Sequence, residues 1–336
     1  MKKQDPHAPP LRGSLPPEGA DPVWGGPAPD RAAVDAVIAR VKAVYGRWRR
    51  DTTVAQMRAD WDQLFGAPGT ADVQDVVATH VPCQWVTAPG VDTGRTVVYF
   101  HGGGFQVGSL ASHRELMACI SAASGACVLG VGYRLAPEHR YPAALEDALA
   151  AYGWLRAQGV AAERIAVAGD SAGGGLGLSL LLALQRRGEL MPAAYWGLSA
   201  WTDLTASGES YETRATLDPI HQRPMIAAMA RNYLGGTGDP KDPLASPLFA
   251  APDELAALPP MLLQVGERET VVSDSEAFVQ RAREAGATAE LQVWPGMIHV
   301  FQQFPTVLTE ARDALADGGR FLSARFDAAS HRRTTP

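Results

Sequence analysis

The chain has 336 residues, of which 46% are hydrophobic, enough to bury a sizeable core in one large domain or two smaller ones. Its formal net charge of -6 offers no basic field for phosphates, so composition argues against a nucleic-acid partner. Cys83, Cys119 and Cys127 form an odd set without metal-ligand spacing, which argues against a disulfide framework or a zinc site. We expect no metal ion and no organic cofactor.

The N-terminal sequence has no apolar region of the kind that a signal peptide needs. The longest largely apolar run, 176–184, is far shorter than the roughly 20 residues of a membrane span. We therefore expect a soluble, cytoplasmic protein with no membrane insertion. Residues 1–30 are rich in proline and polar residues and show no periodicity, which predicts a flexible N-terminal arm.

Helical spacing begins at Arg31, and two helices are predicted before the first strand, at 32–45 and 53–64. Segments typical of strands and helices then alternate, which predicts a mostly parallel sheet with helices on both faces. The strands are predicted at 84–87, 96–100, 126–132, 164–168, 195–199, 261–265 and 291–294. The helices between and after them are predicted at 113–124, 142–158, 172–187, 273–285 and 305–326.

One long connection, 201–260, interrupts this alternation and contains a helical stretch near 224–233. A connection of this length within a compact α/β domain is usually a lid or a binding element. We predict a single domain over 31–326, followed by a C-terminal tail at 327–336.

A serine lies between glycines where a predicted strand meets a predicted helix, in the sequence IAVAGDSAGGG (165–175). Ser171 is the centre of a G-x-S-x-G pattern, in which a sharp turn exposes the serine hydroxyl at the edge of the sheet. The small neighbours are needed because the turn is strained and its flanks approach closely. By itself, the pattern is also compatible with a turn that only connects a strand to a helix.

A second glycine motif, HGGGF (101–105), follows the strand predicted at 96–100. Consecutive glycines leave backbone N–H groups free to point inward, and those of Gly103 and Gly104, with that of Ala172, are expected to form an oxyanion hole. His101, Gly102 and Asp170 belong to the two motifs and are expected to support this site. The spacing differs from the G-x-G-x-x-G of dinucleotide-binding proteins, which argues against a phosphate loop.

A serine becomes an effective nucleophile when a base takes its proton. His299 lies just after the last predicted strand, and among eight histidines it alone combines a loop after a late strand with the expected chain order. Surface or structural roles are expected for the histidines outside the two motifs, namely His7, His80, His113, His139, His221 and His331.

The acid that orients His299 is expected between the last two predicted strands, where GERETVVSD (266–274) offers three carboxylates. Glu269, three residues after the glycine, is the best candidate. Glu267 is predicted to be a solvated neighbour, and Asp274 to be the N-cap or first turn of the next helix. The role of Glu269 would be to orient the imidazole and stabilise the imidazolium without accepting the proton.

With these motifs, the chain resembles the hormone-sensitive-lipase-like branch of the α/β-hydrolases, which contains bacterial carboxylesterases and related lactone hydrolases. The resemblance covers about 31–326 and includes HGGGF (101–105), YRLAPEHRYPAALED (133–147), GDSAGG (169–174) and GMIHVF (296–301). Within the branch, three further segments are similar to esterases that include a monoterpene ε-lactone hydrolase: WTDLTASGES (201–210), YLGG (233–236) and DPLASPL (242–248).

The resemblance implies an α/β-hydrolase fold with an eight-stranded sheet and a helical cap formed by about 31–65 and 201–245. The cap would shape the substrate pocket through residues near Trp24, the early helices and the segment 225–229. It also implies a small-molecule ester or lactone as substrate and no cofactor, and it allows a homodimer.

Two positions depart from the usual pattern of this branch. Glu269 stands where most members have aspartate, and Gly132 stands where many relatives have aspartate before Tyr-Arg-Leu-Ala-Pro. We expect the aspartate of those relatives to be structural, because Glu138 and the Arg134 segment remain here and are predicted to brace the sheet near the oxyanion loop.

The motifs and the resemblance together predict a serine carboxylesterase that acts on small, short-chain acyl esters through Ser171, His299 and Glu269. A lactone hydrolase or an N-acyl amide deacylase would use the same residues and differ only in leaving group and pocket shape. A non-catalytic ligand receptor on this fold would typically have lost a triad residue, and both Ser171 and His299 are present. A nucleotide-binding oxidoreductase would use the glycine loops differently.

Overall fold

The computed structural model describes residues 29–49, 51–66 and 71–334. Most of the predicted N-terminal arm, Trp24 included, lies outside the described residues.

An eight-stranded sheet forms the centre of the molecule, in the order β1-β2-β4-β3-β5-β6-β7-β8. β2 is antiparallel to both of its neighbours, and all other neighbouring strands pair in parallel. The strands are β1 (Asp72–Ala78), β2 (Val81–Thr87), β3 (Asp92–Phe100), β4 (Ala126–Val131), β5 (Ile165–Asp170), β6 (Ala194–Leu198), β7 (Met261–Gly266) and β8 (Ala289–Trp294). The predicted eight-stranded, mostly parallel α/β sheet is confirmed.

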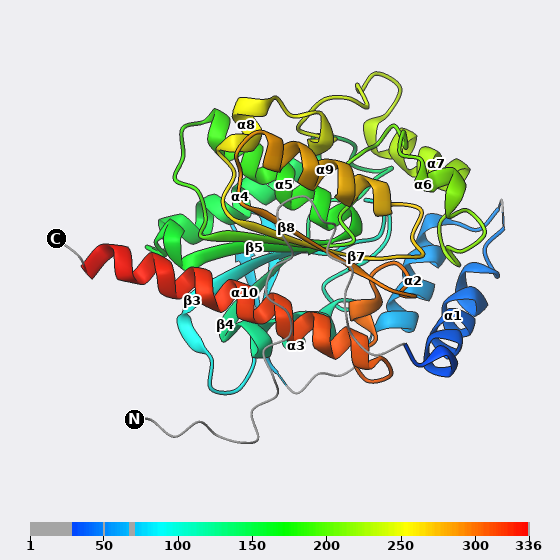
Figure 1. The fold of residues 1–336 in the computed structure, drawn as a ribbon, viewed down its shortest axis with the longest axis horizontal. Helices are drawn as coiled ribbons and strands as arrows, with labels where there is room; N and C mark the ends of the chain where they lie inside the picture. The colour runs from blue at the N-terminus through cyan, green and yellow to red at the C-terminus, as the bar shows by residue number, and fades with distance from the viewer. Residues whose placement is uncertain (1–28, 50, 67–70, 335–336) are drawn as a thin grey trace.

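Helices cover both faces of this sheet (Figure 1). One face carries α3 (Arg114–Ser124) and α10 (Thr309–Thr334), which also pack on each other. The other face carries α4 (Ala143–Ala157), α5 (Ser171–Arg186) and α9 (Val272–Glu284), with the short α8 (Pro252–Ala256) packed on α9. β4, β5, β6 and β7 are buried along their whole lengths, as expected for parallel strands between two helical layers.

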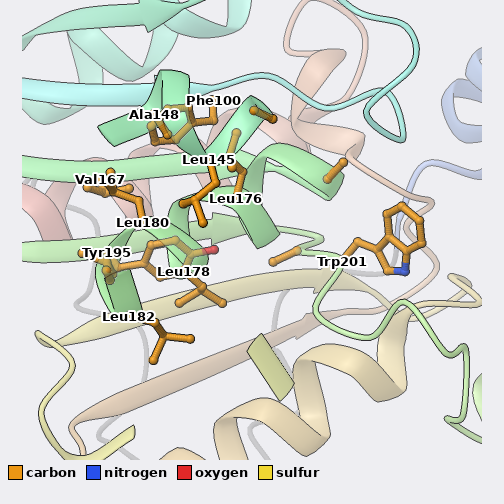
Figure 2. Close-up of a cluster of buried hydrophobic side chains, with 14 of the residues drawn as sticks. Phe100, Leu145, Ala148, Val167, Leu176, Leu178, Leu180, Leu182, Tyr195 and Trp201 are labelled. Atoms are coloured by element: carbon orange, nitrogen blue, oxygen red, sulfur yellow. The ribbon is translucent and has the colours of Figure 1, made fainter. Parts of the chain in front are cut away.

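Helix α5 runs through the core and is buried from Ser171 to Leu184. Its leucines pack among side chains of the sheet, including Phe100, Val167 and Tyr195 (Figure 2). The glycines at its start allow a close approach that larger residues would prevent: a Cβ on Gly173 would lie 2.1 Å from the carbonyl oxygen of Phe100. The glycines therefore place the beginning of α5 directly against the end of β3.

Four helices gather at one end of the sheet, and we call them the cap (Figure 1). They are α1 (Arg31–Tyr45), α2 (Val54–Phe65), α6 (Ser210–Thr213) and α7 (Arg223–Leu234). Asp30 caps α1 by accepting from the N–H groups of Ala32 and Ala33, and Thr53 caps α2. The cap joins two segments that are far apart in the sequence, which places both beside the same strand ends.

Two parts of the chain differ from the sequence-based prediction. Strand β1 is not predicted, because it is an edge strand whose side chains are mostly exposed and show no apolar alternation. Residues 327–334 are not a tail, because α10 continues through them to Thr334. No glycine or proline follows Phe326 before the helix ends, so nothing in this stretch stops it.

The close approach at Gly173 predicts that Gly173→Ala destabilises the protein by about 1–3 kcal/mol, because the new methyl group meets backbone that cannot move cheaply. Gly153→Ala is the matched control: Gly153 lies in α4 with open space around its Cβ position, so alanine should stabilise the helix by about 0.5–1 kcal/mol. Chemical unfolding of both variants measures the two changes. Equal free energies of unfolding for Gly173→Ala and Gly153→Ala would contradict the packing argument.

Candidate active site

Ser171 lies at the junction of β5 and α5, as predicted, in a strained backbone conformation with φ +50°. Such a conformation costs of order 1–3 kcal/mol for a residue other than glycine. The turn is tight enough that a Cβ on Gly169 would lie 2.5 Å from the carbonyl oxygen of Gly173. The strained turn thus places the Ser171 side chain at the carboxyl end of β5.

His299 follows β8, and its Nδ1 lies 2.6 Å from Oε2 of Glu269 in the loop after β7. Glu269 is fully buried, and its other oxygen accepts from the Ser199 hydroxyl (2.7 Å) and the Gly266 N–H (2.5 Å). Ser199 Oγ in turn accepts from the N–H of Val300 at 3.1 Å. One serine therefore fixes both the carboxylate and the loop that carries the imidazole.

The ion pair changes the acidity of His299. Burial alone would lower the pKa of this imidazole, but the charge of Glu269 and the hydrogen bond to it outweigh burial and raise the pKa above the ordinary value. The outer nitrogen, Nε2, is buried and has no hydrogen-bond partner within the described residues, Ser171 included. Ser171 and His299 nevertheless line the same pocket.

The glycine loop after β3 faces this pocket with Gly103 (φ +115°) and Gly104 (φ +60°). Within the part of the chain that the structure describes, their N–H groups donate no hydrogen bond. The N–H of Ala172 belongs to the first turn of α5, where an α-helix provides no acceptor. The three predicted donors therefore flank Ser171 with their hydrogen-bonding capacity unused.

The buried carboxylate of Asp170 joins this loop to the serine turn. Its Oδ1 accepts from the Tyr99 hydroxyl (2.5 Å) and the Gly102 N–H (2.9 Å), and it lies 3.4 Å from Nε2 of His113. Burial raises the pKa of Asp170, but the charge of His113 and hydrogen bonds from His113 and Tyr99 outweigh it and hold the pKa below its ordinary value. The carboxylate is thus charged, and its Oδ1 joins the serine turn to the glycine loop.

His101 supports the same loop from behind. Its ring stacks on Tyr133 at 4.4 Å, the Tyr133 hydroxyl donates to the His101 carbonyl oxygen at 2.6 Å, and Nδ1 lies 2.8 Å from the carbonyl oxygen of Gly102. Burial lowers the pKa of His101 to about 4, so the imidazole is neutral at neutral pH. His101 therefore fixes the backbone of the glycine loop.

Arg58 of α2 clamps the cap to the glycine loop. Its guanidinium binds both carboxylate oxygens of Glu138 (2.9 and 2.8 Å) and the carbonyl oxygens of Gln106 and Ala136. Glu138 therefore lies beside the glycine loop as predicted. The Arg134 side chain binds Asp147 of α4, while its segment braces the loop through the Tyr133 hydroxyl, which donates to the His101 carbonyl oxygen, and the Ala136 N–H, which donates to that of Phe105. At Gly132, an added Cβ would meet the carbonyl oxygen of Pro82 at 2.8 Å, so glycine suits the packing here.

The pocket between the sheet and the cap has a volume of about 20 Å³. On the side of the cap, the pocket is lined by Tyr45, Trp61, Phe65, Ile220, His221 and Met229. Met229 lies closest to the glycine loop, because a Cβ on Gly104 would be 2.5 Å from its sulfur. Of the predicted cap segment 225–229, Met229 lines the pocket and Met225 does not.

Three residues at the site are missed by the sequence-based prediction. Ser199 directly follows β6, just as Ser171 follows β5, so the rule that ligands bind at the carboxyl ends of parallel strands could have identified it. His221 and Asp218 lie in the long connection, where no periodicity or motif distinguishes them. His221 is buried beside His299, with ring centroids 4.4 Å apart and an angle of 85° between the rings.

Within residues 29–49, 51–66 and 71–334, no group of three or more histidine, cysteine, aspartate or glutamate side chains could hold a metal ion. The described cysteines are all free thiols. The described helices also include none with the length and apolar character to cross a bilayer.

Comparison with known proteins agrees with this architecture. A model of the alpha/beta hydrolase fold family matches residues 97–303, more than half of the chain, and the chain belongs to this family. An acetyl-hydrolase from Streptomyces hygroscopicus is 42% identical over 260 residues, covering 77% of this chain and 85% of that protein. An ethyl acetate hydrolase from Pseudomonas putida is 33% identical over 227 residues, covering 66% of this chain and 70% of that protein.

A solved structure described as an esterase from the bacterial hormone-sensitive lipase family matches with a TM-score of 0.84 and 41% sequence identity. The match covers 88% of this chain and 98% of that chain. These similarities confirm the predicted resemblance to the hormone-sensitive-lipase branch, and they assign the chain to the carboxylic ester hydrolases.

Asp274, the alternative acid, has other partners than His299. It lies in the first turn of α9, as predicted, and accepts from the Asp203 N–H (3.1 Å) and the Tyr211 hydroxyl (3.2 Å). Its Oδ1 is buried without a hydrogen-bond partner among the described residues. Burial, and after it the negative charge of Asp203, raise the pKa of Asp274 well above its ordinary value, so the neutral acid is favoured.

Asp274→Asn should therefore gain stability relative to the wild type as the pH rises. The unfolded chain releases this proton near pH 4. The folded protein holds it to higher pH, so wild-type stability falls between the two pKa values by up to about 1.4 kcal/mol per pH unit. Asparagine has no such titration and keeps an oxygen for Asp203 and Tyr211. Chemical unfolding of both proteins from about pH 5 to 8 measures the difference, and a pH-independent difference would contradict a neutral Asp274.

Proposed function

We propose that the protein is a serine carboxylesterase that hydrolyses short-chain acyl esters through Ser171, His299 and Glu269. The observation that carries the proposal is the buried imidazole of His299. It is held by Glu269 at 2.6 Å through Nδ1, and its Nε2 is left unpaired in the pocket that Ser171 shares. This is the arrangement that a general base for a serine nucleophile requires.

In the first half of the reaction, His299 Nε2 takes the proton of Ser171 as the hydroxyl oxygen attacks the ester carbonyl carbon. The hydrogen bond to Glu269 keeps the proton of His299 on Nδ1, so Nε2 is free to accept. Glu269 also stabilises the imidazolium that forms, consistent with the raised pKa of His299. The protonated His299 then gives its proton to the departing alkoxide, and the acyl group remains on Ser171.

The negative charge on the carbonyl oxygen is stabilised by the N–H groups of Gly103, Gly104 and Ala172. Removing one such donor typically costs about 2.7–4 kcal/mol of transition-state stabilisation. The donors are preorganised, because Asp170 and His101 hold the loop before substrate binds. In the second half, His299 takes a proton from water as the water oxygen attacks the acyl carbon. The protonated His299 then returns this proton to Oγ of Ser171 as the Ser171–acyl bond breaks, which releases the carboxylic acid and restores both residues.

The small pocket supports short acyl groups as substrates. A volume of about 20 Å³ is close to the space of one water molecule, so every ester substrate requires side chains of the wall to move, and a longer acyl chain requires more of this movement. Lactones and N-acyl amides present the same carbonyl group to Ser171 and serve here as comparison substrates.

The triad assignment predicts that Ser171→Ala and His299→Ala each lower kcat for p-nitrophenyl acetate by at least about 10⁴-fold, because each variant lacks a group that acts in the chemical step. Steady-state kinetics with the ester, with lactones and with N-acetyl amides of similar size measure the effect and the leaving-group preference. Folding of each variant is checked by thermal unfolding. Near-normal turnover by either folded variant would overturn the proposal.

Glu269→Gln tests the acid separately. Removing the negative charge should lower the pKa of His299, so the acid limb of the kcat/KM profile should move to lower pH while the rate itself falls. Asp274→Asn is the matched control, because it removes a buried carboxyl group that does not contact His299, and its acid limb should stay in place. A shift in Asp274→Asn that exceeds the shift in Glu269→Gln would show that the acid is misassigned.

Met229 should limit the acyl chain length, because its sulfur lies over Gly104 in the pocket wall. Met229→Ala is expected to raise kcat/KM for p-nitrophenyl octanoate relative to the acetate by about tenfold or more, since each buried CH₂ is worth about 0.8 kcal/mol. Met229→Leu, which keeps the volume, is the control. An unchanged chain-length profile in Met229→Ala would place the limit elsewhere.

A further inference from the structure

The cap contributes a second imidazole to the pocket that contains Ser171 and His299. His221 is only 6% exposed, and its ring packs edge-to-face with that of His299. It comes from the long connection before α7 and not from a strand end, so it belongs to the part of the fold that shapes the pocket. None of the steps assigned to Ser171, His299 and Glu269 uses it.

His221 is also a buried polar group without a hydrogen bond. Its Nδ1 has no partner among the described residues, and the nearest carboxylate oxygen, Oδ2 of Asp218, is 3.9 Å away. That oxygen already accepts from the N–H and the hydroxyl of Thr270, and Oδ1 accepts from the N–H groups of Ile220 and His221. Because Nδ1 faces Asp218, a ligand in the pocket would pair with the other ring nitrogen, Nε2. One such hydrogen bond is worth about 0.5–1.5 kcal/mol.

The backbone that carries the ring is held in place before any ligand binds, and the ring itself packs on His299. Asp218 ties the backbone of His221 to Thr270, which is the neighbour of Glu269 in the loop after β7. Around it, the cap wall offers the apolar side chains of Trp61, Phe65, Ile220 and Met229. A fixed hydrogen-bonding group in an otherwise mainly apolar wall selects ligands more sharply than a mobile one, because little ordering cost remains.

The charges near this ring define the chemistry of the ligand. Burial first, and the neighbouring His299 second, lower the pKa of His221, so its imidazole is neutral and carries one donor and one acceptor. The carboxylate of Asp170 lines the same pocket, and those of Asp218 and Glu269 lie behind the two imidazoles, so an anionic group is disfavoured there. An uncharged hydroxyl fits best, because it both donates and accepts and so pairs with either tautomer of the ring.

Position decides which part of the ester carries that hydroxyl. His299 Nε2 delivers its proton to the leaving oxygen, so the alcohol portion of the ester begins within hydrogen-bonding distance of His299. His221 packs directly on the ring of His299 and therefore borders this portion. We propose that His221 is a specificity-determining residue that binds a hydroxyl on the alcohol portion, so that the preferred substrates are partial esters of diols and polyols. This inference rests on the proposed esterase function.

The test compares ethyl butyrate with 2-hydroxyethyl butyrate, which differ by one hydroxyl on the alcohol portion. The wild type should show the higher kcat/KM for the hydroxylated ester, and in His221→Leu the ratio of the two values should fall by about tenfold, as expected for one hydrogen bond. Comparing the ratio between proteins cancels the difference in intrinsic reactivity of the two esters. The same ratio in the wild type and in folded His221→Leu would overturn the inference.

Two further variants separate recognition from packing. His221→Gln keeps a hydrogen-bonding group and should retain part of the preference, whereas Ile220→Leu alters the same wall without a polar group and should leave the ratio unchanged. If His221→Leu does not fold, the other two variants decide. Loss of the preference for the hydroxylated ester in both His221→Gln and Ile220→Leu would overturn the inference, because packing alone would then set the ratio of the two kcat/KM values.

The outcomes also distinguish this inference from the proposed function. If the wild type cleaves both esters and Ser171→Ala cleaves neither, but the ratio does not depend on His221, the esterase assignment stands and the inference fails. If the wild type cleaves p-nitrophenyl acetate but neither butyrate ester, the inference alone fails. If it cleaves none of the three esters, both are overturned.

Discussion

The geometry of the candidate active site depends on buried carboxylates that join the ends of neighbouring strands. Asp170, at the end of β5, holds the glycine loop after β3 through the N–H of Gly102. Glu269, after β7, holds Ser199 after β6 and His299 after β8. Each carboxyl group is buried, and hydrogen bonds and nearby imidazoles compensate for the water that it loses. The strand ends are thereby fixed relative to one another.

Backbone strain is concentrated in the same region. Ser171, Ser199, Val300 and Phe105 all adopt positive φ without being glycine, and all lie just after the carboxyl ends of strands of the sheet. Such conformations persist only where the surroundings determine them, and here the packed core under α5 and the carboxylate bonds do so. Several residues are therefore strained at the place where the proposed hydrogen-bond donors and base are already positioned before substrate binds.

Some parts of the fold and the site could be predicted from the sequence because they produce a local pattern or motif, and others could not because they depend on contacts between distant residues. Parallel strands between helical layers are continuous apolar runs, so β3 to β7 were predictable, whereas the exposed edge strand β1 was not. Ser171 and the glycine loop carry local motifs, and His299 and Glu269 follow from strand order. Asp218 and His221 act through contacts across the cap, to Thr270 and His299, and such contacts leave no periodic trace in one sequence.

Arg58 connects the cap to the backbone beside the glycine loop, in addition to holding α2 in place. The same guanidinium that anchors α2 also holds the carbonyl oxygen of Gln106, the residue after the glycine loop, and that of Ala136, whose N–H donates to the carbonyl oxygen of Phe105 in the loop. An outward displacement of α2 would have to break these hydrogen bonds or move the backbone next to the glycine loop. The position of this cap helix and the conformation of the loop are therefore coupled through a single side chain.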